Sequence, residues 1–199
     1  MRRSGPIAGK LAPLALGLLL AGCSLFRGPP AETFDLFGPE ALPRGGGTAA
    51  QILIPESTAL KILDSQSIVV AAGPKISYYP QAQWPDRLPR LFQERAIEAF
   101  DRSRRARAVG RPGEGLSIDY QLLTDIRSFE YQAASGGGTA HVEIQARIMD
   151  DRNGRVVASR DFTADAPVTA DNATAVVTGL QAALDKVLID LVRWTVAAI

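Results

Sequence analysis

Apolar residues recur at helical spacing in two stretches of the chain. Residues 84–103 repeat them at steps of three and four, which predicts a first helix with Pro85 and Pro89 at or before its first turn. Residues 172–196 carry a second such stripe, and we expect Asp171 to cap its start. Charged residues along the other side of the second stretch exclude a membrane-spanning helix. We therefore expect its stripe to pack on a sheet, or in part on a partner or a second copy.

Short extended segments are predicted ahead of the first helix. They fall at residues 33–37 and 51–54, with the glycine-rich loop of Gly45, Gly46 and Gly47 between them. Residues 66–79 then predict two strands that meet at a Gly73-Pro74 turn.

Three longer strands are predicted between the two helices, at residues 116–131, 140–149 and 155–164. We expect the first to bend near Arg127 and the last two to meet at an Asn153-Gly154 turn. A flexible, exposed loop is predicted at residues 135–138. Together these elements predict an α+β fold, a mixed and mainly antiparallel sheet with two principal helices packed on it.

The longest apolar run of the N-terminal region is too short to cross a membrane. Residues 11–21 would form a helix of roughly 16 Å, whereas a bilayer core is about 30 Å thick. Arg2, Arg3 and Lys10 precede the run, and no acidic residue occurs before Glu32. A basic start, a short apolar run and small residues after it are typical of a signal peptide.

The end of this run, Leu20-Ala21-Gly22-Cys23, resembles the bacterial lipobox. The resemblance implies that the Cys23 thiol is coupled to a diacylglycerol and that the chain is cleaved before it. Small residues at Ala21 and Gly22 would let the segment enter the peptidase. The predicted layout is a lipoprotein signal peptide at 1–22, a lipidated tether at 23–32 and a single α+β domain at 33–199. An ordinary secretory signal with a chance cysteine is the alternative.

Charge and cysteine content narrow the function classes. The chain has 199 residues and a net charge of +1, which becomes −2 once the three basic residues of 1–22 are removed. A net charge so close to zero does not indicate nucleic-acid binding, which usually requires a basic surface. Cys23 is the only cysteine, so the mature chain forms no internal disulfide and depends on its apolar core.

Residues that could carry catalysis or hold a metal are few. The only histidine, His141, falls on the polar face of a predicted strand, where a surface role is expected. Asp150-Asp151 looks like a metal pair but belongs to the predicted hairpin turn, where acidic residues are good turn formers. We therefore expect no catalytic residue, no metal site and no cofactor beyond the covalent lipid on Cys23.

The order of the elements and several motifs resemble the auxiliary lipoproteins of ABC-type lipid transport systems. These work beside inner-membrane proteins that bear mammalian-cell-entry (MCE) domains. After the lipobox, the resemblance is carried by "TFDL" at 33–36, by the block with Tyr78, Tyr79 and Trp84, by "YQLLTDIRSFEY" at 120–131, and by a closing hairpin and helix with Trp194. It extends over about residues 32–196.

The resemblance implies a non-catalytic lipoprotein on the periplasmic face of the outer membrane. Its partners would be an MCE-domain protein and, through it, an ABC permease and ATPase; a homo-oligomer is left open. Ser24 after the lipidated cysteine fits sorting to the outer membrane. An accessory lipoprotein of another outer-membrane assembly or transport machine is the alternative, and an envelope hydrolase has no support in the sequence.

Three aromatic residues are candidates for partner binding. Tyr78, Tyr79 and Trp84 are rigid aromatics beside a turn, a composition favoured at interfaces. The competing interpretation places Tyr78 and Trp84 in the core where the hairpin meets the first helix, and it is the stronger one for Trp84.

Overall fold

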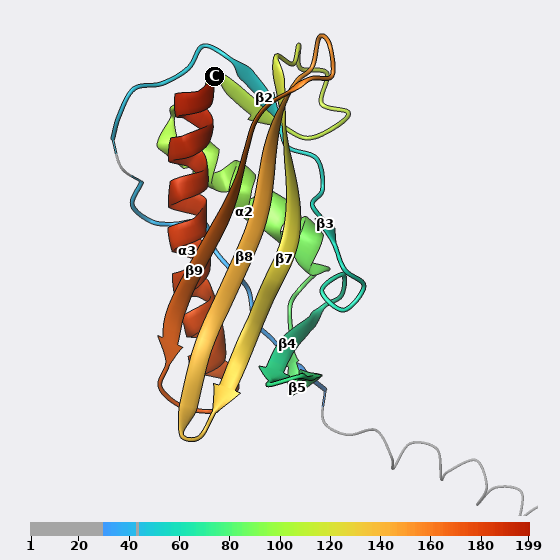
Figure 1. Ribbon diagram of the computed structural model, residues 1–199, viewed down its shortest axis with the longest axis vertical. Coiled ribbons are helices and arrows are strands. Elements are labelled where there is room, and N and C mark those ends of the chain that lie inside the picture. The colour runs from blue at the N-terminus through green and yellow to red at the C-terminus, as the bar shows by residue number, and fades with distance from the viewer. Residues whose placement is uncertain (1–29, 43) are drawn as a thin grey trace, which may run out of the picture. The chain divides into compact units, whose positions relative to one another are not determined.

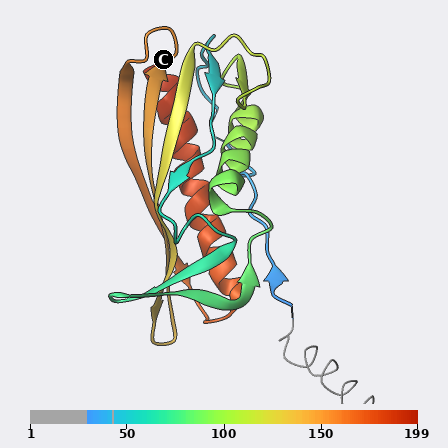
Figure 2. The ribbon, with the colours of Figure 1, turned by 90° about the vertical axis from the view of Figure 1, so that its right-hand side faces the viewer.

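The structure is a computed structural model that describes residues 30–42 and 44–199. Residues Glu32–Ile199 form one unit, in which two helices lie on one face of a single sheet (Figure 1; Figure 2). This is the α+β fold with a mixed, mainly antiparallel sheet that the sequence predicts. The predicted cleavage residues Leu20, Ala21 and Gly22, and the predicted lipid site Cys23, lie outside the described residues.

Three long antiparallel strands form the body of the sheet. They are β7 (Tyr120–Ala134), β8 (Gly137–Asp150) and β9 (Val156–Val168), and all three are longer at their C-terminal ends than predicted. Ile126 of β7, Ile144 of β8 and Phe162 of β9 lie opposite one another in register and are buried. The ladder shifts by one residue between Ile126 and Ser128, so the predicted bend near Arg127 is confirmed as a bulge.

The loop predicted at 135–138 is correct for Ser135 and Gly136, which form an exposed turn, and wrong for Gly137 and Gly138. Only Ser135 and Gly136 form the turn, while Gly137 and Gly138 belong to β8. A side chain at Gly138 would place its Cβ 2.2 Å from the carbonyl oxygen of Gln132, so the close approach of the two strands requires glycine there. The glycines therefore extend the hairpin instead of interrupting it.

Short strands line the other side of β7 in parallel. From the start of β7 to its end these are β2 (Gln51–Leu53), β3 (Thr58–Ala59) and β4 (Ser67–Ala72). β6 (Ala108–Gly110) pairs in parallel with β2 at the sheet's edge. The sequence did not predict β3, β6 or any of the parallel pairings.

A second hairpin extends from the lower end of the sheet. β4 pairs antiparallel with β5 (Lys75–Gln83), as predicted, and the turn holds Gly73 at a φ of +58°. β1 (Glu32–Thr33) pairs in parallel with only the last two residues of β5. Figure 2 shows this hairpin reaching beyond the long strands.

The first helix, α2 (Leu88–Ser103), begins four residues later than predicted. Trp84 is still extended, and its N–H donates to the carbonyl oxygen of Gln66 at 2.7 Å. The cause is Pro85, because a residue that precedes proline is disfavoured in the helical region. Pro89 then falls in the first turn of α2, where its missing N–H costs no helical hydrogen bond.

The second helix, α3 (Ala173–Ala198), crosses behind β8 and β9. Its N-cap is Asn172, whose Oδ1 accepts a hydrogen bond from the Ala175 N–H at 2.9 Å, so the prediction of Asp171 as the cap is wrong by one residue. The apolar stripe of α3 is buried against the sheet at Val176, Leu180, Leu184, Val187 and Leu191. Within the described part of the chain, neither helix has the length and apolar character needed to cross a bilayer.

Candidate functional site

Trp84, one of the three aromatic candidates, lies in the core. Its side chain is 1% exposed and packs edge-on against Phe129 of β7, with ring centroids 6.0 Å apart. This placement favours the core interpretation of Trp84, because the ring has no face left for a partner.

Tyr79 is half-buried and ties the hairpin to the start of α3. Its hydroxyl donates to Asp171 Oδ1 at 3.2 Å, across 92 residues of sequence. Burial raises the pKa of Tyr79, and the negative charge of Asp171 raises it further. The phenol therefore remains a proton donor at neutral pH, and its contact with Asp171 is intramolecular.

Tyr78 faces solvent. Its side chain is 49% exposed, and Ile76, two residues earlier on the same face of β5, is 51% exposed. In the described part of the chain, the outer side of β5 is paired only by β1 at Ala82 and Gln83. Residues 75–79, called the hairpin edge below, therefore combine exposed apolar side chains with an unpaired strand edge.

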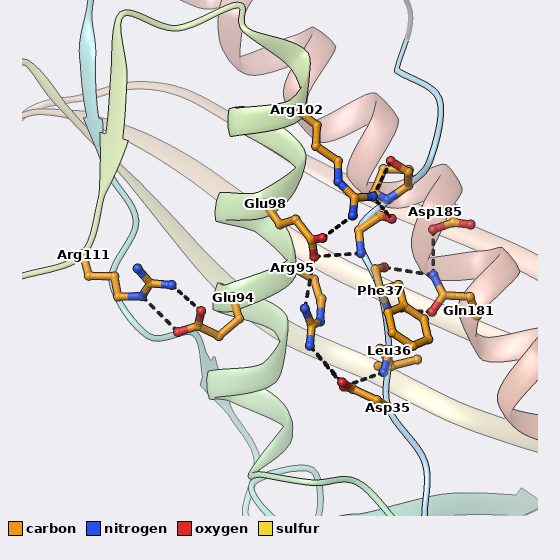
Figure 3. A network of polar contacts seen from close by, with 12 residues as sticks. Asp35, Leu36, Phe37, Glu94, Arg95, Glu98, Arg102, Arg111, Gln181 and Asp185 are labelled. Atoms are coloured by element: carbon orange, nitrogen blue, oxygen red, sulfur yellow. Dashed lines mark hydrogen bonds and ion pairs between the residues drawn. The ribbon is translucent and has the colours of Figure 1, made fainter.

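The chain after β1 crosses both helices as an extended segment. We call residues 34–42 the strap. Leu36 of the strap is fully buried, whereas the neighbouring Phe37 is 59% exposed. Gln181 of α3 binds both backbone groups of Phe37: its Oε1 accepts from the Phe37 N–H at 2.8 Å and its Nε2 donates to the Phe37 carbonyl at 3.0 Å (Figure 3).

Two arginines of α2 bind the strap as well, in addition to Gln181 of α3. Arg95 pairs with Asp35 at 3.1 Å and with Glu98 at 3.0 Å. Arg102 donates to the carbonyl oxygen of Gly38 at 2.8 Å and also pairs with Glu98 (Figure 3). Arg95 in the middle of α2 and Arg102 in its last turn thus both help to fix the strap.

Glu98 lies at the centre of this network. Burial raises its pKa, but hydrogen bonds from Arg95 and the Gly38 N–H, with the charge of Arg102, outweigh burial, so the pKa of Glu98 lies below its ordinary value. The carboxylate is therefore ionised at neutral pH, and its negative charge is balanced by Arg95 and Arg102.

Between the strap and α3 the surface is hollowed. We call this cavity of about 410 Å³ the strap hollow; its walls include Phe37, Pro39, Glu40, Ala41, Asp185 and Ile189. Asp185 accepts a hydrogen bond from Gln181 Nε2 at 2.8 Å. Burial raises the pKa of Asp185; the hydrogen bond from Gln181 offsets part of this rise, and the charge of Glu40 adds to it.

Sequence reasoning missed the strap hollow. Gln181 and Asp185 are spaced i, i+4 beside the buried stripe of α3, which is a weak signal on its own. The strap that completes the cavity lies more than 140 residues earlier in the chain, at Phe37.

His141 and the acidic pair Asp150-Asp151 belong neither to the hairpin edge nor to the strap hollow. His141 Nδ1 is 2.6 Å from Asp165 Oδ1 of the neighbouring strand β9. Asp150 Oδ1 accepts from the Arg152 N–H at 2.9 Å, which is a turn contact. Across residues 30–42 and 44–199, no three His, Cys, Asp or Glu side chains are grouped so that they could hold a metal ion.

Comparison with known proteins finds a relative by sequence. The uncharacterized protein bll6063 of Bradyrhizobium diazoefficiens is 34% identical over 175 residues, which are 86% of this chain and 47% of the relative. The chain therefore spans about half the length of that curated relative.

Solved structures are similar as well. Protein XCC0632 from Xanthomonas campestris superposes with a TM-score of 0.76 at 28% identity, over 84% of this chain and 96% of that one. The hypothetical protein CT253 from Chlamydia trachomatis shares the fold, with a TM-score of 0.55 at 8% identity over 76% of this chain and 98% of its own. Because the model of the ABC-type transport auxiliary lipoprotein components matches residues 34–192, this chain belongs to that family, as the resemblance in its sequence predicted.

Proposed function

We propose that this chain is a non-catalytic lipoprotein subunit of an ABC/MCE-type lipid transport system. It is held at the periplasmic face of the outer membrane by the lipid on Cys23 and docks an MCE-domain protein, through which it works with an ABC permease and ATPase. The observation that carries the proposal is the exposed hairpin edge on a chain of this auxiliary family.

The hairpin edge has the physical features of a strand-docking surface. Unpaired backbone groups along residues 75–79 can accept an extended segment of a partner as a further strand. Ile76 and Tyr78 would contribute apolar contacts, and a rigid tyrosine loses little side-chain entropy when it becomes ordered. Long exposed edges are otherwise avoided because they promote aggregation, so an edge of this kind suits a surface that is covered in an assembly.

The proposed anchor follows from the lipobox at Cys23. One acyl chain gives only reversible membrane binding, whereas several chains at about 0.8 kcal/mol per buried CH₂ make the attachment stable. Ser24 after the cysteine supports the outer membrane as the destination.

The docking proposal is tested by capture from cells that carry the natural partners. A tagged full chain, extracted in detergent, is expected to retain an MCE-domain protein. Replacing Ile76 and Tyr78 by serine should reduce the retained amount at least tenfold, since central apolar contacts dominate interfaces. Leu60→Ser is the control, because Leu60 is 69% exposed and follows β3, outside the hairpin edge. Retention of a different envelope machine and no MCE-domain protein would contradict the proposal.

The anchor is tested separately by membrane fractionation. The native chain is expected in the outer-membrane fraction, and Cys23→Ser should release it into a soluble fraction because no acyl chain can be attached. Recovery of the native chain with the inner membrane would contradict the outer-membrane assignment.

A further inference from the structure

The carboxylates of the strap hollow lack the ion pairs that neighbouring carboxylates make. On the α2 side, Asp35 and Glu98 are ion-paired with Arg95, and Glu94 with Arg111 (Figure 3). By contrast, Asp185 and Glu40 take part in no ion pair among the described residues.

Asp185 is fixed in place by the strap's own anchoring residue. Gln181 uses its oxygen and one N–H for Phe37 and donates to Asp185 Oδ1, so it cannot turn away without releasing the strap. A carboxylate held in a partly desolvated cavity, with Glu40 nearby, favours the arrival of a positive charge.

The remaining walls of the hollow are apolar. Phe37 presents an exposed ring, and Pro39, Ala41 and Ile189 add aliphatic surface. A charged head on a flexible aliphatic stem fits this combination, because the stem can lie along apolar walls while the head reaches the carboxylates. Lysine and arginine side chains have this form. One face of the Phe37 ring already lies 6.0 Å from the guanidinium of Arg95, so the ring serves here as apolar wall.

We propose that the strap hollow is a docking site for a lysine or arginine side chain of the protein partner. The inference rests on the proposed function, because it names the chemistry by which the MCE-domain protein is held beside the hairpin edge. The two surfaces are linked along the chain, since β1 pairs with the base of β5 and leads directly into the strap.

Other occupants fit the hollow less well. A bare divalent cation favours six or more oxygen ligands, and the described residues contain no cluster of metal-ligating side chains. An acyl chain would desolvate Asp185 and Glu40 without compensation. A phosphate-bearing headgroup would be repelled by the same two carboxylates.

The test compares two ways of removing negative charge near α3. The full-length double variant Asp185→Asn, Glu40→Gln removes both carboxylates of the hollow and leaves an oxygen at 185 that can accept from Gln181. Asp190→Asn is the matched control, because Asp190 is an exposed residue of the same helix that pairs with Arg193. Thermal unfolding of each variant shows that it is folded.

We expect the double variant to retain about tenfold less MCE-domain protein than the native chain in the capture experiment, and the Asp190→Asn control to retain the native amount. With p-benzoylphenylalanine in place of Ala41, photocrosslinking should join the hollow to a partner peptide that contains lysine or arginine. Equal retention by double variant and control, or crosslinking only to lipid or to a second copy, overturns this inference and leaves the proposed function standing. Failure of the native chain to retain any MCE-domain protein overturns the proposed function itself.

Discussion

The strap and the hairpin edge are linked through β1, which pairs with the end of β5 and leads into the strap, yet the two are held in opposite ways. The strap is an irregular segment, yet three side chains from two helices, Arg95, Arg102 and Gln181, bind its side chains and carbonyls. The hairpin edge is regular strand, yet Tyr78 and Ile76 are half exposed and its outer backbone groups are unpaired within the described residues. An irregular segment can therefore be firmly bound to the domain, while a regular strand can remain exposed and able to bind a partner.

This difference bears on the proposed membrane anchor. The strap follows the predicted tether. The polar contacts of Arg95, Arg102 and Gln181 with the strap, called the clamps below, therefore fix the first part of the domain after the proposed anchor. The hairpin of β4 and β5 is fastened by buried Trp84, which follows β5, and by the Tyr79–Asp171 hydrogen bond, whereas Ile76 and Tyr78 remain exposed. We expect substitutions at the base of the hairpin and in the clamps to affect stability, and substitutions at the edge to affect binding.

The largest effect is expected at the base of the hairpin. Trp84→Ala removes a fully buried ring and its contact with Phe129, and should lower the free energy of unfolding by about 4 kcal/mol. Tyr78→Ala, six residues earlier on the exposed edge, should change it by less than about 0.5 kcal/mol. Urea denaturation of the purified chain measures both. Similar losses for the two variants would show that the edge is not free.

A smaller loss in the free energy of unfolding is expected when one of the side chains that bind the strap is removed. Arg95 is 20% exposed and compensates Asp35 and Glu98, so Arg95→Ala should cost about 2 kcal/mol and speed amide hydrogen exchange at Leu36 and Gly38. Arg90→Ala is the control on the same helix, because Arg90 is 61% exposed and its pair with Asp86 should contribute almost nothing. Unchanged exchange in Arg95→Ala would mean that apolar contacts alone hold the strap.

The clamp also predicts how stability depends on pH. The pKa of Glu98 is lower in the folded chain than its ordinary value of 4.5, so the unfolded chain binds the proton more tightly. Its contribution is fully present above pH 4.5 and is lost as the pH falls through the lower, folded-state pKa. Glu98→Gln should therefore flatten the acid limb of a stability curve measured by urea denaturation. An acid limb identical to that of the native chain would contradict this assignment.

The smallest effect, opposite in sign, is expected in the strap hollow. The pKa of Asp185 is raised by burial, so its ionised form opposes folding once the pH rises above 3.8, the ordinary value. Asp185→Asn should therefore be slightly more stable than the native chain at neutral pH, as thermal unfolding would show. A gain in stability with a loss of partner retention is typical of a residue kept for binding. A loss of stability would contradict this prediction and would mean that the hydrogen bond from Gln181 outweighs the cost of burying the Asp185 carboxylate.

The elements predicted correctly are those with a local signal. The stripe of α3, the alternation of β8 and the turns at Gly73-Pro74 and Asn153-Gly154 all follow from residues close together in sequence. The errors also have local causes. The start of α2 depended on the conformational effect of Pro85, and the glycines at 137 and 138 are strand residues because a neighbouring strand approaches them closely.

The candidate sites could be predicted only in part. The sequence marked Tyr78, Tyr79 and Trp84 together, but the structure separates them into an exposed residue, a bridging residue and a core residue. Nothing in the local pattern distinguishes these roles, because all three are aromatic residues of one extended segment.

By itself, the sequence determined the α+β class and the family, and it predicts the lipid site, since each depends on periodicity or on residues adjacent in the chain. Only the tertiary structure decided that short parallel strands line β7, that the strap is clamped by α2 and α3, and that Asp185 and Glu40 share a cavity without a cation among the described residues. The physical reason is distance along the chain: Phe37 and Gln181 are 144 residues apart, and only the packing of the core brings them together.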